Sequence, residues 1–357
     1  MNIAKTLKPK DQLKPKPADE NNLGFGRIFT DHMLLMDYQT GKGWHNPRVE
    51  PYGPFTLDPA AMIFHYGQEV FEGLKAYRGE GGHVYMFRPA ANIERMNRSC
   101  DRLCIPALPN EVVLEAMYEL IRVEQDWIPR AEGTSLYVRP TIIATEACLG
   151  VKTSATYLFY IITGPVGAYY AEGFNPVRIW VEEKYVRAAI GGTGEAKTSG
   201  NYASSLKAAT EAHEKGFTQV LWLNACDRQS IEEVGTMNIF FKIAGEVITS
   251  PLDGSILPGV TRDSVLALCR HWGMNVSERQ LTIDDIIAAA KAGTLEEAFG
   301  TGTAAVISPV GSIHFKGQDY QVADGQTGAL SLKLYDEITG IQLGKKPDPF
   351  GWVVKVA

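Results

Sequence analysis

A stretch rich in glycine, proline and aromatic residues, GPVGAYYAEGFNP at residues 164–176, separates two parts of this chain that differ in pattern. Such a composition is typical of a connection and not of the interior of a helix or strand. The chain has 357 residues, and a typical domain has roughly 150. We therefore expect two domains, residues 1–170 and residues 171–357, of which the second is the larger.

The first half alternates strand and helix patterns. HVYMFRP is a short β-rich run, and SLYVRPTIIAT and TYLFYIITGPV are two longer ones. Apolar residues recur at helical spacing in residues 92–106 and 111–129, with Asn92 as the expected N-cap of the first helix and Pro106 as its stop. The lysine- and proline-rich first ~20 residues are expected to form an arm that is mobile or lies on a surface. This half is expected to be a mixed α/β domain.

The second half is richer in strand patterns. VRIWVEE, QVLWLN and NIFFKIAGEVITSP predict strands, the last of them two strands joined by a turn. TRDSVLALCRHWG and TIDDIIAAAKAG predict helices that end at glycine. NYASSLKAATEAHEKG predicts a further helix with Ala203, Leu206, Ala209 and Ala212 on one face and Gly216 at its end. The fold class is therefore α+β, with a β-rich C-terminal domain.

Composition limits the kind of partner. The net charge of -6 and the pI near 5.7 argue against nucleic acid or an anionic membrane as main partner, which leaves a small molecule. No apolar run reaches the ~20 residues of a membrane span, and no signal peptide is recognisable. Five cysteines without a CxxC pair predict reduced thiols in the cytoplasm, and no metal site is expected. Cys100 and Cys104 are expected to be core residues on one helix face.

One lysine, Lys197, stands among small residues in GGTGEAKTSGNYASS at residues 191–205. A nucleotide phosphate loop is one explanation, but the pattern G-x-x-x-x-G-K-[ST] fails at Ala196, and Glu195 would repel a phosphate. A solvated lysine in a turn is another. The third explanation is that Lys197 is itself the reagent and forms an imine with an aldehyde cofactor.

Pyridoxal phosphate is the aldehyde cofactor that the rest of the chain fits best, because it needs partners for a phosphate, a ring nitrogen and a ring hydroxyl. The phosphate could bind the N–H groups of Val260 and Thr261 at a helix start, or the hydroxyl-bearing turn GTGTAA at residues 300–305. Glu232 and Glu233 alternate in direction on an extended chain, so only one of them is expected to point inward. Tyr202 can reach the ring hydroxyl.

Seven blocks of sequence, in order, resemble the branched-chain amino acid aminotransferases, which are fold-type IV pyridoxal-phosphate enzymes with the D-amino acid aminotransferase-like fold. They are YGQEVFEGLKAYR, NIERMNRSCDRL, YVRPTIIATEACLGVK, GEAKTSGNYASSLKA, EEVGTMN, LPGVTRDSVL and FGTGTAAVISPV. Some animal members carry a CxxC pair after the last Gly-Thr-Ala turn. This chain reads AVIS there, which excludes a thiol switch at that position.

The resemblance implies a role for each matching residue. Lys197 would be the catalytic lysine that is bound to the cofactor, and Glu233 would hold the protonated ring nitrogen. The remaining cofactor-binding residues would be Arg95, Tyr202, Thr236, Val260, Thr261 and Thr303. The substrate-binding residues would be Tyr66, Phe71, Tyr137, Arg139, Leu149, Val151, Tyr169, Thr236, Thr303 and Ala304, of which Leu149 and Val151 would reach the site of a neighbouring subunit.

The implied activity is transamination between L-leucine, L-isoleucine or L-valine and 2-oxoglutarate in a cytoplasmic homodimer with active sites near the subunit interface, in branched-chain amino acid biosynthesis. Relatives on the same fold act on D-amino acids or as aminodeoxychorismate lyases, and they remain alternatives. A P-loop nucleotide-binding protein is a further one. The sequence does not rank leucine, isoleucine and valine.

Overall fold

The computed structural model describes residues 3–167 and 174–357. Contacts divide the chain into two compact units. The first comprises Met1–Tyr169, Ala196–Ser199 and Gly340–Ala357, and the second comprises Tyr170–Glu195 and Gly200–Thr339. The expected boundary assigned Lys197 and the C-terminus to the second domain. Instead, both segments group with the first unit, which is therefore not the smaller of the two.

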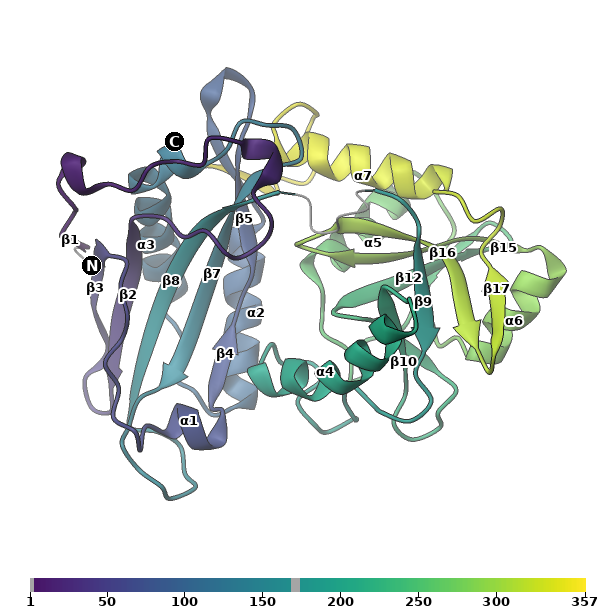
Figure 1. Cartoon of the computed structure of the whole chain (residues 1–357), viewed down its shortest axis with the longest axis horizontal. Coiled ribbons are helices and arrows are strands. Elements are labelled where there is room, and N and C mark those ends of the chain that lie inside the picture. Colours follow the sequence, from purple (N-terminus) through teal and green to yellow (C-terminus); the bar gives the residue numbers. More distant parts are fainter. Residues whose placement is uncertain (1–2, 168–173) are drawn as a thin grey trace. The chain divides into compact units, whose positions relative to one another are not determined.

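The first unit contains a nine-stranded, mostly antiparallel sheet (Figure 1). Its strand order is β1-β3-β2-β8-β7-β5-β6-β18, with β4 paired to β7. The strands are β1 (Ala4–Lys5), β2 (His32–Gln39), β3 (Gly43–Pro51), β4 (Glu69–Phe71), β5 (Leu74–Arg78), β6 (Val84–Phe87), β7 (Ser135–Ala144), β8 (Thr156–Val166) and β18 (Val353–Lys355). The three strands expected in this half are confirmed as β6, β7 and β8.

Helices α2 (Pro89–Arg102) and α3 (Asn110–Val123) lie on one face of this sheet, behind the strands in Figure 1. Because successive side chains of a strand point to opposite faces, β7 buries Leu136 and Val138 in the core with these helices. Tyr137 and Arg139 therefore lie on the opposite face, away from the helices. A short helix, α1 (Met62–Tyr66), precedes β4.

The ends of the predicted helices needed correction. Helix α2 begins at Pro89 and not at Asn92, because proline at the first helical position needs no N–H partner. Asn92 is buried inside the helix instead. The second helix ends at Val123, followed by the 3-10 turn Gln125–Trp127. Cys104 lies beyond the end of α2 and is exposed, so it shares no helix face with the buried Cys100.

The N-terminal arm is fastened to the first unit by Asp31. Its carboxylate accepts hydrogen bonds from Lys14 N (2.9 Å) and Trp127 Nε1 (2.9 Å), and Lys16 Nζ lies 3.6 Å away. Lys8 N donates to His32 Nε2 at 2.9 Å. Burial by itself would raise the pKa of Asp31, but these donors and the nearby lysines outweigh it and lower the pKa. Of the two states expected for the arm, the structure shows the one that lies on a surface.

Asp31→Asn is expected to loosen the arm, because hydrogen bonds to a charged acceptor contribute about 1.5–3 kcal/mol each. We expect hydrogen exchange at Lys14 N–H to accelerate about 10- to 100-fold at neutral pH. In the wild type, the ionised Asp31 stabilises the folded arm, and this contribution to stability is fully present above the ordinary carboxyl pKa of about 3.9. It is lost as the pH falls through the lower folded value. Asp11→Asn, at an exposed position of the arm, is the control. Unchanged exchange in Asp31→Asn would show that Asp31 does not hold the arm.

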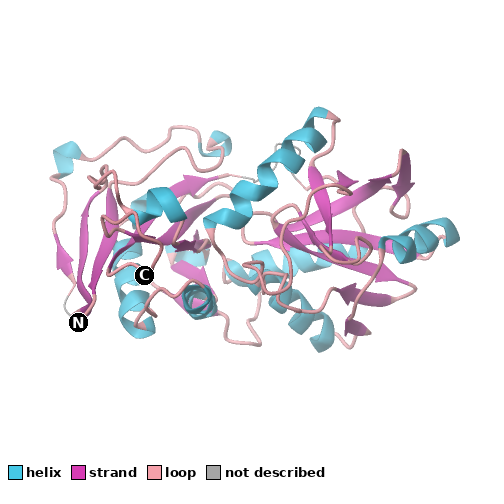
Figure 2. Cartoon of the chain, turned by 90° about the horizontal axis from the view of Figure 1, so that it is seen from below, coloured by secondary structure: helices cyan, strands magenta, loops and turns pink. Residues whose placement is uncertain are grey.

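The second unit contains a sheet whose pairings close on themselves. Figure 2 shows the strands of the chain in magenta and its helices in cyan. The order is β11-β10-β9-β16-β15-β12-β13-β14, β17 pairs with β16, and β12 also pairs with β11, so six strands form a closed barrel. The strands are β9 (Val177–Val181), β10 (Gln219–Leu223), β11 (Ile231–Val234), β12 (Met237–Ile243), β13 (Glu246–Thr249), β14 (Val276–Glu278), β15 (Leu295–Gly302), β16 (Val306–Phe315) and β17 (Gln318–Gln321). The predicted strands of this half are confirmed as β9, β10, β12 and β13.

The helices of this part of the chain are α4 (Ser199–Glu214), α5 (Val260–His271), α6 (Ile283–Ala292) and α7 (Ala329–Gln342). Gly216, with φ of 82°, follows the end of α4, as predicted. The predicted face of α4 is wrong, because Leu206 is 64% exposed and the buried positions are Asn201, Ala208 and Ala212. Among the described helices, none is long and apolar enough to cross a membrane.

Candidate active site

Lys197 is held in the first unit by hydrogen bonds of its own backbone. Its N–H donates to Ser99 Oγ on α2 at 2.9 Å, and its carbonyl accepts from Phe71 N on β4 at 3.0 Å. The next residue, Thr198, donates its hydroxyl to Glu69 O at 2.7 Å. The half-buried Lys197 side chain places Nζ 5.0 Å from the centre of the Phe71 ring. The backbone of residue 197 is thereby held so that its amine lies beside an aromatic ring that the sequence analysis assigned to substrate binding.

The glycine-rich segment before Lys197 does not have the form of a phosphate loop. A side chain at Gly194 would meet Ser255 O at 2.1 Å and Ala188 Cβ at 2.7 Å. Gly194 is therefore needed for close packing against protein backbone. Ala196 is buried and Glu195 is exposed. Close packing thus accounts for Gly194, and the role of Lys197 as the reagent stays a prediction.

Glu72 is a central residue of the site that the sequence analysis missed. It is fully buried, and its carboxylate accepts from Arg95 Nε (2.7 Å), Arg95 Nη2 (2.9 Å) and Asn92 Nδ2 (2.8 Å). Gly73 N donates to the same carboxylate at 3.1 Å. Burial would raise the pKa of Glu72, but Arg95, Lys197 and Asn92 together lower it. Glu72 is thus an anion that orients Arg95, the predicted phosphate ligand.

Arg139 and Tyr137 form a second polar group on the sheet face opposite the helices. Arg139 Nη2 donates to Tyr137 OH at 3.0 Å, and its guanidinium lies 4.8 Å from the centre of the Phe71 ring. Arg139 Nε is buried and has no hydrogen-bond partner among the described residues. Burial raises the pKa of the nearby Glu69, against the opposing effects of Ser199 and Arg139. A guanidinium with an unused, buried N–H is suited to an incoming carboxylate.

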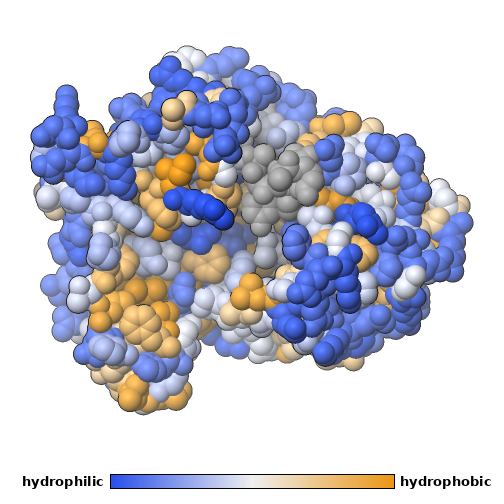
Figure 3. Space-filling view, viewed as in Figure 1, coloured by the Kyte–Doolittle hydropathy of each residue, from blue (hydrophilic) through white to orange (hydrophobic). Residues whose placement is uncertain are grey.

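The two residues that were predicted to reach a neighbouring subunit lie on the surface. Leu149 is 65% and Val151 is 86% exposed, and Tyr66 OH donates to Leu149 O. Phe64 on α1 is also largely exposed. Figure 3 shows apolar side chains gathered over this end of the first unit. Tyr169, the other predicted pocket residue, lies outside the described residues.

In the second unit, both adjacent glutamates of β11 are buried, so burial does not show which of them points inward, and that expectation stays a prediction. Glu233 Oε1 accepts from Leu257 N at 2.8 Å, and its Oε2 lies 3.2 Å from Arg187 Nε. Glu232 Oε1 accepts from Asn224 Nδ2 (3.0 Å) and Ser255 Oγ (2.6 Å). Burial raises the pKa of Glu232, while Ser255 and Arg187 oppose the shift.

The other predicted residues of the second unit lie at turns and helix starts. Val260 and Thr261 begin α5 after the N-cap Gly259, whose Cβ, if present, would meet Asn238 Oδ1 at 2.0 Å. Thr303 and Ala304 form the turn between β15 and β16. Near this turn, Thr301 Oγ1 and Ser308 Oγ are buried without a hydrogen-bond partner among the described residues.

Tyr202 is half-buried in the first turns of α4. Thr236 is exposed in the two-residue turn between β11 and β12.

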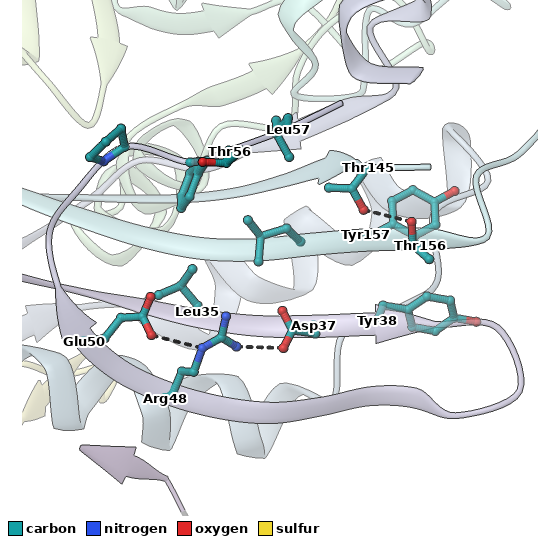
Figure 4. A pocket seen from close by; sticks show the side chains of 13 residues that line it. Leu35, Asp37, Tyr38, Arg48, Glu50, Thr56, Leu57, Thr145, Thr156 and Tyr157 are labelled. Carbon is teal, nitrogen blue, oxygen red and sulfur yellow. Dashed lines mark hydrogen bonds and ion pairs between the residues drawn. The ribbon is translucent and has the colours of Figure 1, made fainter. Parts of the chain in front are cut away.

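A separate hollow of about 420 Å³ lies on the first unit, between strands β2, β3 and β8 and residues 54–57 (Figure 4). None of the predicted site residues lines it. Its arginine, Arg48, is bound by Asp37 (2.7 Å) and Glu50 (3.2 Å), so its charge is already matched. This hollow therefore has no evident part in the chemistry of Lys197. Within the described part of the chain, no group of three or more His, Cys, Asp or Glu side chains could hold a metal ion.

Comparison with known proteins identifies the family and the fold. Residues 69–313 match the family model of amino-transferase class IV. The chain is 60% identical over 344 residues to branched-chain-amino-acid aminotransferase 2 of Bacillus subtilis, covering 96% of this chain and 94% of that protein. The branched-chain amino acid aminotransferase of Escherichia coli has a similar structure, with a TM-score of 0.74 and 27% identity over 90% of this chain and 99% of that one.

A further similar structure is the T.th. branched-chain amino acid aminotransferase complexed with N-(5'-phosphopyridoxyl)-L-glutamate. Its TM-score is 0.74 at 25% identity, over 91% of this chain and 98% of that one. The fold and the fixed lysine thus define a class IV aminotransferase. Within that class, the chain belongs to the family of the branched-chain amino acid aminotransferases. The predicted fold type and family are confirmed.

Proposed function

We propose that this chain transfers the amino group between L-leucine, L-isoleucine or L-valine and 2-oxoglutarate, with pyridoxal 5'-phosphate as cofactor. The family membership supports the reaction class. The observation that carries the proposal is the position of Lys197 Nζ over the Phe71 ring, near the Glu72–Arg95 pair. A relative in this family has been crystallised with a phosphopyridoxyl-glutamate adduct, which supports the cofactor.

The side chains present fit that cofactor. Lys197 offers a primary amine for its aldehyde, and Glu233 offers a buried carboxylate for its ring nitrogen. Arg95, the α5 start at Val260 and Thr261, and the Thr303 turn offer donors of the kind that bind phosphate. Gly259 keeps the α5 start free of a side chain that would collide with Asn238. We assign Tyr202 to the ring hydroxyl and Thr236 to the cofactor and substrate carboxylate.

Each side chain then has a defined task in the reaction. When bound, the cofactor supplies the carbon that receives the amino group and a ring that withdraws electrons from the substrate Cα. Lys197 Nζ would take the proton from that Cα and deliver it to the aldehyde-derived carbon of the cofactor, C4'. Glu72 holds the Arg95 guanidinium in one orientation through two parallel hydrogen bonds. Phe71, Tyr66 and Tyr169 are assigned to the aliphatic side chain of the substrate, and Ala304 to its α-carboxylate.

Arg139→Met is expected to impair the 2-oxoglutarate half-reaction selectively. Its unpaired, buried Nε is the donor that we assign to the second carboxylate of 2-oxoglutarate. A lost hydrogen bond to a charged group costs about 1.5–3 kcal/mol, so kcat/KM for 2-oxoglutarate should fall about 10- to 100-fold. Single-turnover kinetics of each half-reaction measures this effect. The value of kcat/KM for L-leucine should fall less than the value for 2-oxoglutarate. Equal losses in both halves would mean that Arg139 serves the α-carboxylate or the fold.

We further propose that the enzyme acts as a cytoplasmic homodimer. The exposed Leu149 and Val151 favour a second subunit as their partner, since exposed apolar side chains in one patch mark interaction sites. Five free cysteines suit a reducing compartment. Sedimentation of Val151→Asp against the wild type would test the dimer, with dissociation as the expected result.

A steady-state assay of the purified chain with 2-oxoglutarate and a panel of L- and D-amino acids tests the proposed function. We expect turnover of L-leucine, L-isoleucine and L-valine and production of glutamate, with no turnover of their D-enantiomers. Preference for D-alanine would favour a D-amino acid aminotransferase. Release of pyruvate from aminodeoxychorismate, without glutamate formation, would favour the lyase alternative.

A further inference from the structure

Arg187 is a buried arginine of the second unit that the sequence analysis did not single out. It lies in the segment between β9 and α4. Its Nε is 3.2 Å from Glu233 Oε2, with both side chains almost entirely buried. Its Nη2 donates to Gly194 O at 3.1 Å and to Ser255 O. The guanidinium therefore joins two backbone segments to the carboxylate that we assign to the cofactor ring nitrogen.

The two oxygens of the Glu233 carboxylate have different surroundings. Oε1 accepts from Leu257 N at 2.8 Å, and Asn238 Nδ2 lies 3.4 Å from it. Both of these donors are neutral. Oε2 lies 3.2 Å from Arg187 Nε, within ion-pair distance. Arg187 thus offsets the charge of Glu233.

A second buried carboxylate increases the need for this cation. Glu232 precedes Glu233 on β11 and is equally buried. Burial of two adjacent carboxylates penalises their ionisation, and each disfavours the charge of the other. Arginine remains protonated at any pH that the protein meets. Without Arg187, we expect Glu233 to take up a proton, because the backbone and amide donors at its other oxygen carry no net charge.

We propose that Arg187 is a positioning residue that keeps Glu233 ionised, so that Glu233 in turn keeps the ring nitrogen of the cofactor protonated. This inference rests on the proposed function, because it requires pyridoxal phosphate at Lys197. A protonated ring nitrogen needs an anionic acceptor, since a charge-assisted hydrogen bond is roughly twice as strong as a neutral one. Arg187 acts only through Glu233 and is assigned no contact of its own with the reacting atoms.

Two substitutions separate the charge of Arg187 from its hydrogen bonds to carbonyls. Arg187→Gln removes the charge and places a neutral amide where Nε stands, beside Glu233, while the donor to Gly194 O and Ser255 O is lost. Arg187→Lys keeps the positive charge but replaces the planar guanidinium and its several N–H donors by a single ammonium group. If Arg187 acts through charge, the glutamine variant loses ring protonation and the lysine variant retains it. If Arg187 only ties backbone segments together, both variants lose the guanidinium and should change ring protonation alike.

The readout is the ¹⁵N chemical shift of the ring nitrogen in holoenzyme reconstituted with ¹⁵N-labelled pyridoxal phosphate. In Arg187→Gln at neutral pH, we expect the ratio of protonated to unprotonated ring nitrogen to fall about tenfold or more, as for a change of one pKa unit. Arg178→Gln is the matched control. Arg178 is paired with Asp319 at 3.2 Å on the surface of the same unit, so its loss should leave the shift unchanged.

The Glu233→Gln background decides whether the effect passes through Glu233. There, Arg187→Gln should change the ¹⁵N shift no further, because interacting residues are not additive. A protonated ring nitrogen in Arg187→Gln, or an additional change in the double variant, would overturn the inference. Borohydride reduction of the same samples distinguishes a failure of the role proposed for Arg187 from a failure of the proposed function. Label on Lys197 with an unaffected shift overturns only the role of Arg187, whereas a wild type without label overturns the proposed function as well.

Discussion

Lys197→Ala is expected to lower kcat for transamination by at least about 10⁴-fold, because positioned proton transfer alone contributes about 10²–10⁴-fold and the covalent anchor is lost too. The fold should survive the change. The hydrogen bonds of residue 197 to Ser99 and Phe71 use its backbone N–H and carbonyl, which alanine keeps. Loss of activity with an unchanged melting temperature would therefore assign the effect to the side-chain amine.

The assay for this prediction is single-turnover transfer from L-leucine, which does not depend on product release. Lys207→Ala is a suitable control, since Lys207 is an exposed lysine of α4 that pairs with Glu211 at 3.1 Å. Its replacement should leave turnover within about twofold of the wild type, because a surface ion pair contributes roughly 0–1 kcal/mol and only to stability. Turnover by Lys197→Ala within about tenfold of the wild type would mean that another base moves the proton.

Glu72→Ala is expected to lower the free energy of unfolding by about 3–5 kcal/mol, because it leaves the Arg95 guanidinium buried without its counter-charge. Arg95 is 4% exposed and makes two hydrogen bonds to Glu72, so it has no easy route to water. Cofactor affinity should fall as well, since Arg95 loses its fixed orientation. Urea denaturation of the apoprotein and titration with pyridoxal phosphate measure the two effects separately.

Glu115→Ala provides the matched control for Glu72. Glu115 also pairs with an arginine, Arg122 at 3.0 Å, but its side chain is 57% exposed. Its removal should cost less than about 1 kcal/mol. The lowered pKa of Glu72 also predicts pH dependence. The contribution of Glu72 to the free energy of unfolding is fully present above the ordinary glutamate pKa of about 4.3. It is lost as the pH falls through the lower pKa that Glu72 has in the folded protein. Equal effects of the two substitutions would show that the Glu72–Arg95 pair does not stabilise the first unit.

Local patterns in the sequence predicted most of the secondary structure. The segments that form β7 and β8 were readable as strands because both are runs rich in β-branched and aromatic residues. The glycines after α4 and α6 marked helix ends because left-handed backbone angles favour glycine. The positions at which helices begin were predicted less accurately. Asn92 is a good capping residue, but its amide is used by Glu72, a partner that only the tertiary structure brings near.

The family could be predicted and Lys197 could be proposed as the catalytic lysine, whereas the buried residues around the proposed site could not be identified. Lys197 stood out because every neighbour is small. Glu72 and Arg187 lie in segments that read as ordinary strand and loop, and their importance comes from burial next to an opposite charge. The acidic residue inside the apolar run VFEGLKAYR was the available signal for Glu72, since a buried carboxylate requires a partner. The face of α4 was misjudged because alanine provides little contrast between its sides.

Borohydride reduction of the holoenzyme followed by peptide mass mapping tests the central claim most directly. Lys75 is the strongest competing lysine, because it is almost entirely buried on β5 and burial lowers its pKa to about 8, which favours the reactive neutral amine. We predict a pyridoxyl group on the peptide that contains Lys197 and none on the peptide that contains Lys75. Label on Lys75, or on no lysine of the chain, would contradict the claim that Lys197 is the covalent link to the cofactor.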